Sequence, residues 1–101
     1  MNLQPRIAIL TRDGEEKMTP IRSVKMGDQV LVKPGAIVPV DGVVLEGHSA
    51  VDESMLSGES MPVSKAVGAQ VSAGTLNTSG VLLVEVNTLL RDTMLSKIIR
   101  L

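Results

Sequence analysis

Short runs of apolar and β-branched residues recur along most of the chain and are separated by turns rich in glycine and proline. Such runs, punctuated roughly every eight to twelve residues, are typical of β-sandwich and jelly-roll domains. The runs that predict strands are 6–12, 17–22, 29–33, 43–45, 70–73 and 81–86. The last of these is the most apolar, which predicts a place at the centre of a sheet. The pattern therefore predicts a mainly β fold, a distorted jelly-roll or β-sandwich.

Paired turn residues mark where these strands end. Asp13-Gly14 predicts a hairpin between the first two strands, and Pro20 favours an edge position for the second. Pro34-Gly35 ends the third strand, and Asp41-Gly42 predicts a turn before the fourth. The glycine- and hydroxyl-rich segment 74–80 predicts an irregular connection.

The period of the apolar residues changes near the C-terminus and predicts a helix there. One face of this helix carries Leu90, Met94, Ile98 and Leu101. Asp92 stands where an N-cap is expected, and Lys97 and Arg100 lie near the negative end of the helix dipole. No C-cap signal ends the helix, and residues 1–5 read as a loose end. We therefore expect residues 1–101 to be one domain excised from a longer protein.

Composition narrows the classes of function. The 101 residues include 10 basic and 11 acidic side chains, so no excess of charge favours nucleic acid or an anionic membrane. There is no aromatic residue and no cysteine, and one histidine cannot form a zinc site by itself. The core must then be built from valine, isoleucine, leucine, alanine and methionine, and the six methionines are expected to fill it. No apolar run approaches the ~20 residues that a membrane-spanning helix needs.

The candidate chemistry lies in the stretch Ser57-Gly58-Glu59-Ser60, where one carboxylate follows a glycine and has a hydroxyl on either side. Gly58 allows backbone angles closed to other residues, which predicts that Glu59 sits on a tight, exposed turn. A projecting carboxylate of this kind can act as a general base or meet a cation. Read alone, so short a motif favours a solvated loop tip over a catalytic site, because short motifs often match by chance.

Four motifs in register resemble the actuator domain of P-type ATPases. Residues 27–42 (GDQVLVKPGAIVPVDG) are similar to the family pattern G-D…P-G…P-x-D-G. Residues 52–63 (DESMLSGESMPV) resemble D-E-S-x-L-T-G-E-S-x-P-V. Residues 74–75 (GT) and 92–95 (DTML) match the pattern further along, so the likeness covers nearly the whole chain. The segment 46–54 (EGHSAVDES) most resembles heavy-metal transporters, particularly copper pumps.

The resemblance implies roles for the residues of the central loop. Glu59 matches the glutamate that positions and activates the water attacking an aspartyl phosphate, and Gly58 matches the glycine that lets the backbone approach the phosphate. Ser57 stands where the family has threonine; it keeps the hydroxyl and loses a methyl group. Asp52 and Glu53 are expected to anchor the base of the loop by hydrogen bonds to backbone, and a position facing the phosphate is a second reading for Glu53. Further support for the loop is expected from Ser60 and Pro62.

For several residues outside that set, the sequence predicts structural or surface positions. Asp41 and Gly42 are expected to fix a turn, and His48 is expected at the surface. Met55 and Met61, which flank the loop, have a second reading besides core filler: an apolar docking rim against a partner domain.

In this family, the actuator domain is a cytosolic unit between transmembrane helices of an integral membrane pump, linked to them at both ends. Its loop docks on the phosphorylation domain and promotes hydrolysis of the aspartyl phosphate, which couples ATP hydrolysis to metal-ion transport. The resemblance implies partners within the same pump, the phosphorylation and nucleotide-binding domains, and no nucleic acid. It places ATP and Mg²⁺ in the full-length pump and neither cofactor nor metal in this domain. The isolated domain is expected to be monomeric and inactive.

Two alternatives from other classes remain at the level of sequence. A carrier module of the biotinyl or lipoyl kind needs a lysine on a hairpin tip; here Met55 is followed by leucine, and Lys65 lacks an acidic neighbour. A plain interaction domain would have an inert loop. No phosphorylatable D-K-T-G, no G-x-x-x-x-G-K-[ST] and no G-x-G-x-x-G occurs in the chain.

Overall fold

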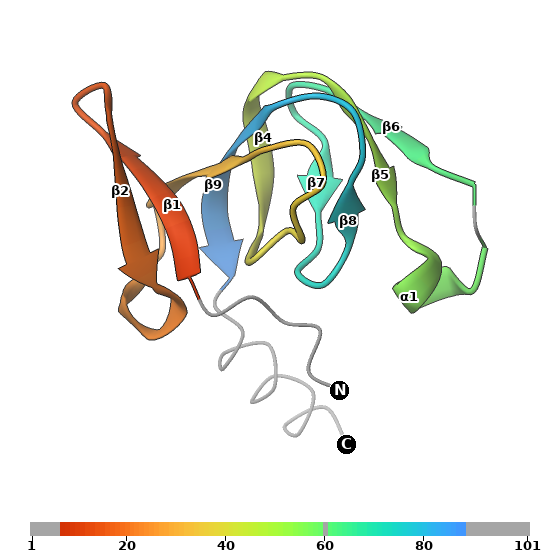
Figure 1. Ribbon diagram of the computed structural model, residues 1–101, viewed down its shortest axis with the longest axis horizontal. Coiled ribbons are helices and arrows are strands. Elements are labelled where there is room, and N and C mark those ends of the chain that lie inside the picture. The colour runs from red at the N-terminus through yellow and green to blue at the C-terminus, as the bar shows by residue number, and fades with distance from the viewer. Residues whose placement is uncertain (1–6, 60, 89–101) are drawn as a thin grey trace.

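Nine antiparallel strands form two sheets within residues 7–59 and 61–88, the part of the chain that the computed structural model describes (Figure 1). The six-stranded sheet has the order β2-β1-β3-β9-β4-β7, with bounds Glu15–Pro20, Ile7–Arg12, Gln29–Val32, Leu82–Thr88, Asp41–Gly47 and Gln70–Val71. The three-stranded sheet has the order β6-β5-β8, with bounds Val63–Lys65, Ser49–Asp52 and Leu76–Asn77. Two short helices complete the described elements: η1, Ile21–Ser23, and α1, Ser54–Ser57.

The hairpin and the central strand agree with the sequence. Strands β1 and β2 pair from Ile7–Pro20 to Arg12–Glu15, which leaves Asp13-Gly14 as a two-residue turn with φ of 52° and 80°. Two positive φ angles are what a type I′ hairpin turn requires. Strand β2 lies at the sheet edge, and β9 lies between β3 and β4. The predicted mainly β class, the edge strand and the central strand are therefore confirmed.

Valine fills most of the core. The inward positions of β3, β4 and β9 alternate with exposed or half-buried ones, and the buried apolar residues are Ala8, Leu10, Val24, Val30, Val32, Val38, Val40, Val44, Val51, Val71, Leu82, Val84 and Val86. The prediction that methionines fill the core is wrong for those described, because they occupy exposed positions on β2, on α1 and in loops. Each is at least half exposed: Met18, Met26, Met55 and Met61.

Two predicted connections contain strand residues instead. Asp41-Gly42, predicted as a turn, opens β4; a Cβ at Gly42 would clash with the carbonyl of Glu85 in β9. The glycine is thus required by the close approach of two strands. Segment 74–80, predicted as irregular, contains β8, whose residues pair with β5. The predicted C-terminal helix and the loose end at 1–5 lie outside the described residues.

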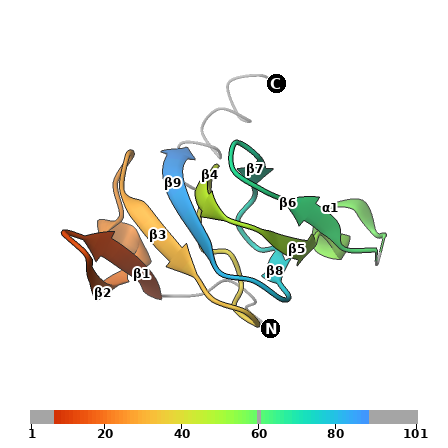
Figure 2. The same ribbon diagram turned by 90° about the horizontal axis from the view of Figure 1, so that it is seen from above.

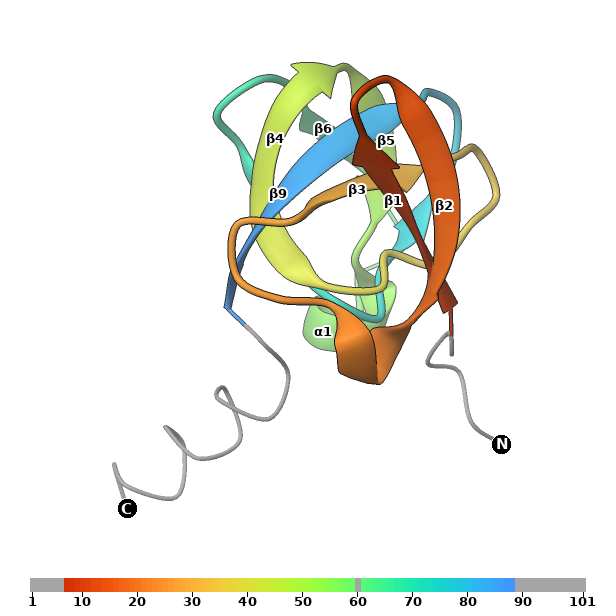
Figure 3. The same ribbon diagram turned by 90° about the vertical axis from the view of Figure 1, so that its left-hand side faces the viewer.

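The elements are spread along one long axis. The β1–β2 hairpin lies at one end and α1 at the other, both in the view of Figure 1 and from above (Figure 2). Viewed along that axis, the strands curve around the core, with the hairpin nearest the viewer (Figure 3). Within the described residues, no helix has the length and apolar character needed to cross a membrane.

Candidate functional site: the loop between strands β5 and β6

The chain leaves β5 through a single helical turn. The backbone amides of Leu56 and Ser57 both donate to the carbonyl oxygen of Glu53, over 2.9 and 3.1 Å. Just before the turn, Asp52 Oδ1 accepts a hydrogen bond from the backbone amide of Ser54 over 2.9 Å. An Asp that bonds two residues ahead is a common way to start a turn. The short helix α1 thus follows the extended strand β5 and leads to the loop tip.

The two hydrogen bonds from Ser54 hold Asp52 in its charged form. The backbone amide of Ser54 and, to a smaller extent, the hydroxyl of Ser54 lower the pKa of the Asp52 carboxyl. Desolvation by burial raises this pKa but is the smallest of the three effects. Hydrogen bonds donated to a carboxylate favour ionisation. Asp52 therefore stays an acceptor at neutral pH, in the supporting position that the sequence suggested.

Gly58 ends the turn in the left-handed region. Its φ is 79°, and its amide donates to the carbonyl oxygen of Ser54 over 2.8 Å, which is the usual geometry of a helix C-cap. A Cβ built at Gly58 would meet nothing within 4 Å. Backbone angle, not packing within this domain, is what requires glycine here.

Ser57 bridges the two sides of the tip. Its hydroxyl donates to the carbonyl oxygen of Glu53 and accepts from the amide of Glu59, both over 3.3 Å. The side chain of Glu59 is exposed, and no residue in the described part of the chain bonds its carboxylate. Ser60 lies outside the described residues, and Pro62 is exposed directly before β6. The tip thus presents, on a fixed turn, one carboxylate that no described residue pairs with.

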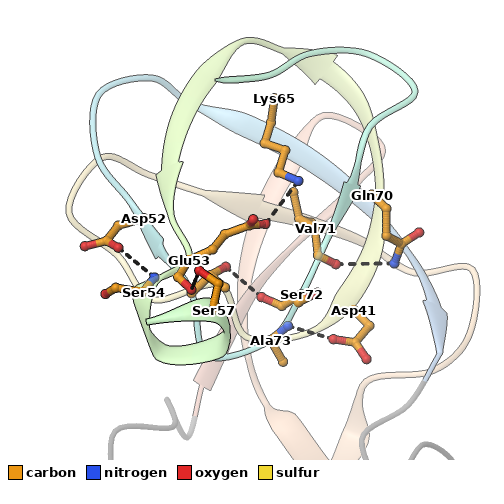
Figure 4. Close-up of polar contacts among 11 residues, drawn as sticks. Asp41, Asp52, Glu53, Ser54, Ser57, Lys65, Gln70, Val71, Ser72 and Ala73 are labelled. Atoms are coloured by element: carbon orange, nitrogen blue, oxygen red, sulfur yellow. Dashed lines mark hydrogen bonds and ion pairs between the residues drawn. The ribbon is translucent and has the colours of Figure 1, made fainter. Parts of the chain in front are cut away.

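Glu53 supports the loop in a way that goes beyond what the sequence predicted. Hydrogen bonds to backbone were expected, and its carbonyl oxygen does accept them; in addition, its Oε2 forms an ion pair with Lys65 Nζ on β6, over 3.1 Å (Figure 4). The two side chains are only 23% and 14% exposed. Sequence reasoning considered Lys65 only as a carrier lysine and missed this pair. The β5–β6 register, Ser49 with Lys65, is what brings them together, and it cannot be read from local sequence.

The described neighbours of the tip are apolar and exposed. We call them the apolar rim: Met55, Leu56, Met61 and Val63, with exposures of 50, 60, 75 and 40%. Apolar side chains gathered beside a polar tip are typical of a surface that meets another protein. Asp41 lies away from the loop, where its carboxylate accepts from the amide of Ala73 over 2.7 Å, and His48 is exposed as expected.

With this geometry in view, the comparisons define the class. The family model described as the P-type ATPase actuator domain matches residues 2–101. A copper-exporting P-type ATPase of Bacillus subtilis is 48% identical over 101 residues, and a probable cadmium-transporting ATPase of Alkalihalophilus pseudofirmus is 46% identical. Each alignment covers 100% of this chain and 13–14% of the relative. A crystal structure of a zinc-transporting PIB-type ATPase in its E2.Pi state superposes with a TM-score of 0.84 at 34% identity, over 97% of this chain and 17% of that one.

The chain therefore belongs to the P-type ATPase actuator domain family. It spans about an eighth of the length of the curated relatives it matches.

Proposed function

We propose that the chain is the actuator domain of a heavy-metal-transporting P-type ATPase, a copper exporter, and that its loop promotes hydrolysis of the aspartyl phosphate. Support for the metal class comes from the relatives, which include copper-exporting pumps of Bacillus subtilis and Staphylococcus haemolyticus. Within such a pump the domain contributes to ATP hydrolysis without binding ATP or Mg²⁺ itself. Those belong to the nucleotide-binding and phosphorylation domains.

One observation carries this proposal: the Glu59 carboxylate is exposed and pairs with no described residue, while the backbone beneath it is fixed. A carboxylate already held in an ion pair would be a poor acceptor for a proton. Glu59 is held at its amide instead, which leaves both carboxylate oxygens available to a water molecule.

The chemistry assigned to Glu59 is general-base catalysis. A water oxygen forms a bond to the phosphorus of the aspartyl phosphate, and the bond from phosphorus to the aspartate oxygen breaks. The aspartate leaves as a carboxylate, and the water gives a proton to Glu59. The phosphoryl oxygens are negative and repel a carboxylate, so the base must orient a neutral water molecule without itself contacting the phosphorus. A carboxylate on a projecting turn can do this.

Docking on the phosphorylation domain of the same pump accounts for the apolar rim. Its four side chains precede and follow the tip along the chain and are 40–75% exposed. Burying them against a partner domain would exclude water from the reaction except for the attacking molecule, and would strengthen the electrostatic contacts at the site.

The test is the decay of the phosphoenzyme in the full-length pump. Glu59→Gln keeps the shape of the side chain and removes the base, so phosphorylation by ATP should persist while decay slows by ~10²–10⁴-fold. A chase of labelled phosphoenzyme with unlabelled ATP measures the decay. Glu46→Gln, an exposed carboxylate on β4, is the matched control and should decay normally. Normal decay of Glu59→Gln would contradict the proposal.

A further inference from the structure

We propose that Lys65 is a positioning residue for the loop: its ion pair with Glu53 sets where the Glu59 carboxylate lies, and thereby the rate of phosphoenzyme hydrolysis. This inference rests on the function proposed for Glu59. Lys65 itself lies on β6, after the loop, and is 14% exposed, so it acts through Glu53 and not by touching the phosphate.

A continuous series of contacts joins Lys65 to Glu59, and Figure 4 shows its first part, from Lys65 through Glu53 to Ser57. Lys65 Nζ pairs with Glu53 Oε2 over 3.1 Å. The carbonyl oxygen of Glu53 accepts the hydroxyl of Ser57 over 3.3 Å, and that hydroxyl accepts the amide of Glu59 over 3.3 Å. The side chain of Glu53 is thus held by Lys65 of β6, while the carbonyl oxygen of Glu53 accepts the hydrogen bonds of the turn. The orientation of the Glu53 side chain therefore affects the position of Ser57 and Glu59.

The ion pair joins the start of the loop to the far end of β6, because Glu53 follows β5 while Lys65 lies opposite Ser49. The last residues that β5 and β6 pair across the sheet are Val51 and Val63, and beyond them Asp52 pairs with Leu76 of β8. Among the described residues, the Glu53–Lys65 pair is therefore the tie between the start of the loop and the strand that follows it. Without it, no hydrogen bond or ion pair of the described residues joins the turn to β6.

The other ion pairs of the described residues differ in exposure. Lys33 and Glu16 are each 51% exposed, and Arg12, which pairs with Asp28, is 69% exposed. Water screens such pairs, and they contribute little. Both partners of the Glu53–Lys65 pair are mostly covered, so their interaction is screened less, and removing one leaves a partly desolvated charge without its partner.

Loss of the pair should misplace the base without unfolding the domain. A Glu53 carboxylate freed from Lys65 turns towards water and takes its backbone, and with it Ser57 and Glu59, out of position. A misplacement of ~1 Å at a reacting group can cost ~10²-fold in rate. We expect Lys65→Met and Glu53→Gln each to slow phosphoenzyme decay by ~10-fold or more in the full-length pump, with phosphorylation by ATP retained.

Four further proteins separate positioning from other roles. The double variant Lys65→Met/Glu53→Gln should decay no more slowly than either single variant, because one interaction is lost in all three. Lys65→Arg keeps the charge and the reach, and should decay nearly as the parent does. Lys33→Met, which breaks an exposed pair, is the control for charge and should also decay normally. Glu59→Gln, run alongside, reports on the proposed function itself.

A second measurement does not depend on activity. In the 101-residue chain, ¹⁵N relaxation of Gly58 and Glu59 should show order parameters falling from ~0.85 towards 0.6 in Lys65→Met, while those of β9 stay high. If that variant does not fold, Glu53→Gln provides the same comparison from the other partner.

The outcomes are distinct. Slow, non-additive decay with rescue by Lys65→Arg supports the inference. Parent-like decay of Lys65→Met or Glu53→Gln, with Glu59→Gln slow, overturns it and leaves the proposed function intact. Additive effects, or no rescue by arginine, would mean that Lys65 acts independently of Glu53 and would also overturn it. Normal decay of the Glu59→Gln phosphoenzyme would contradict the proposed function, and with it the inference that rests on it.

Discussion

The backbone amide of Glu59 donates a hydrogen bond to the hydroxyl oxygen of Ser57 across the left-handed glycine between them. The same hydroxyl donates to the carbonyl oxygen of Glu53. Ser57 therefore links the base of the turn to the backbone of the proposed general base. The methyl group that a threonine would add has little to bury, because Ser57 is exposed.

From this bridge we predict that the hydroxyl at position 57 matters and the methyl does not. A buried methyl contributes at most about 0.8 kcal/mol, so Ser57→Thr should change phosphoenzyme decay by less than about fourfold. Ser57→Ala forfeits hydrogen bonds of ~0.5–1.5 kcal/mol each and should slow decay clearly more. A chase on the three proteins measures this. Alanine decaying as fast as serine, with threonine much faster, would show that packing by the methyl is what counts.

Gly58→Ala should affect the loop in a way that an equal substitution elsewhere does not. Gly58 and Gly68 have φ of 79° and 92°, and a Cβ at either meets nothing within 4 Å. Each alanine variant should therefore lose about 1–2 kcal/mol of unfolding free energy in urea, from backbone strain alone. Only Gly58→Ala should slow phosphoenzyme decay, because its methyl stands where the phosphate must approach. Equal decay in the two variants would contradict this.

The apolar rim predicts a difference between two equally exposed methionines. Met61 beside the loop and Met18 on β2 are 75% and 71% exposed. Serine at either position should change the unfolding free energy of the chain by no more than about 0.5 kcal/mol, as surface substitutions do. In the full-length pump, Met61→Ser should slow phosphoenzyme decay and Met18→Ser should not. If both decay like the parent, the rim takes no part in docking.

The buried amide of Asn77 predicts the largest effect on stability. Its Nδ2 donates to the carbonyl oxygens of Val32 and Gly80 over 3.1 and 2.7 Å, and its Oδ1 accepts from Ser49 Oγ. Asn77→Ala leaves these groups buried without partners, at about 1–3 kcal/mol for each one that stays unsatisfied. Urea unfolding should show a loss of at least about 2 kcal/mol. Asn87→Ala, which removes an exposed amide bonded to Gln70, should cost less than about 1 kcal/mol.

The strands that were predicted well from the sequence are those whose local composition is enough to indicate a buried strand or a hairpin. In β3 and β9 the apolar runs of valine and leucine are enough to predict buried strands, and the Asp13-Gly14 turn sets the register of its hairpin locally. The exposed turn at Glu59 was also predicted from the sequence. The neighbouring Gly58 indicates a positive φ, and that is a local property of the chain.

What the sequence did not predict depends on contacts between distant segments. Asp41-Gly42 has the composition of a turn, yet Gly42 lies against Glu85, forty-odd residues away, in a strand. Strand β8 exists because its two residues pair with Val51 and Asp52 of β5, and Leu76 also bridges to Ile37. The ion pair of Glu53 and Lys65 requires the β5–β6 register, and α1 is too short to show a period.

Oxygen exchange between inorganic phosphate and ¹⁸O-labelled water tests the central claim, that Glu59 activates water, most directly. In the full-length pump, phosphate phosphorylates the aspartate and loses an oxygen as water, and attack by labelled water then returns a labelled phosphate. The exchange involves no ATP and follows the water step itself. We predict that Glu59→Gln lowers its rate by ~10²-fold or more, with Glu46→Gln unchanged. Exchange at the parent rate in Glu59→Gln would contradict the account.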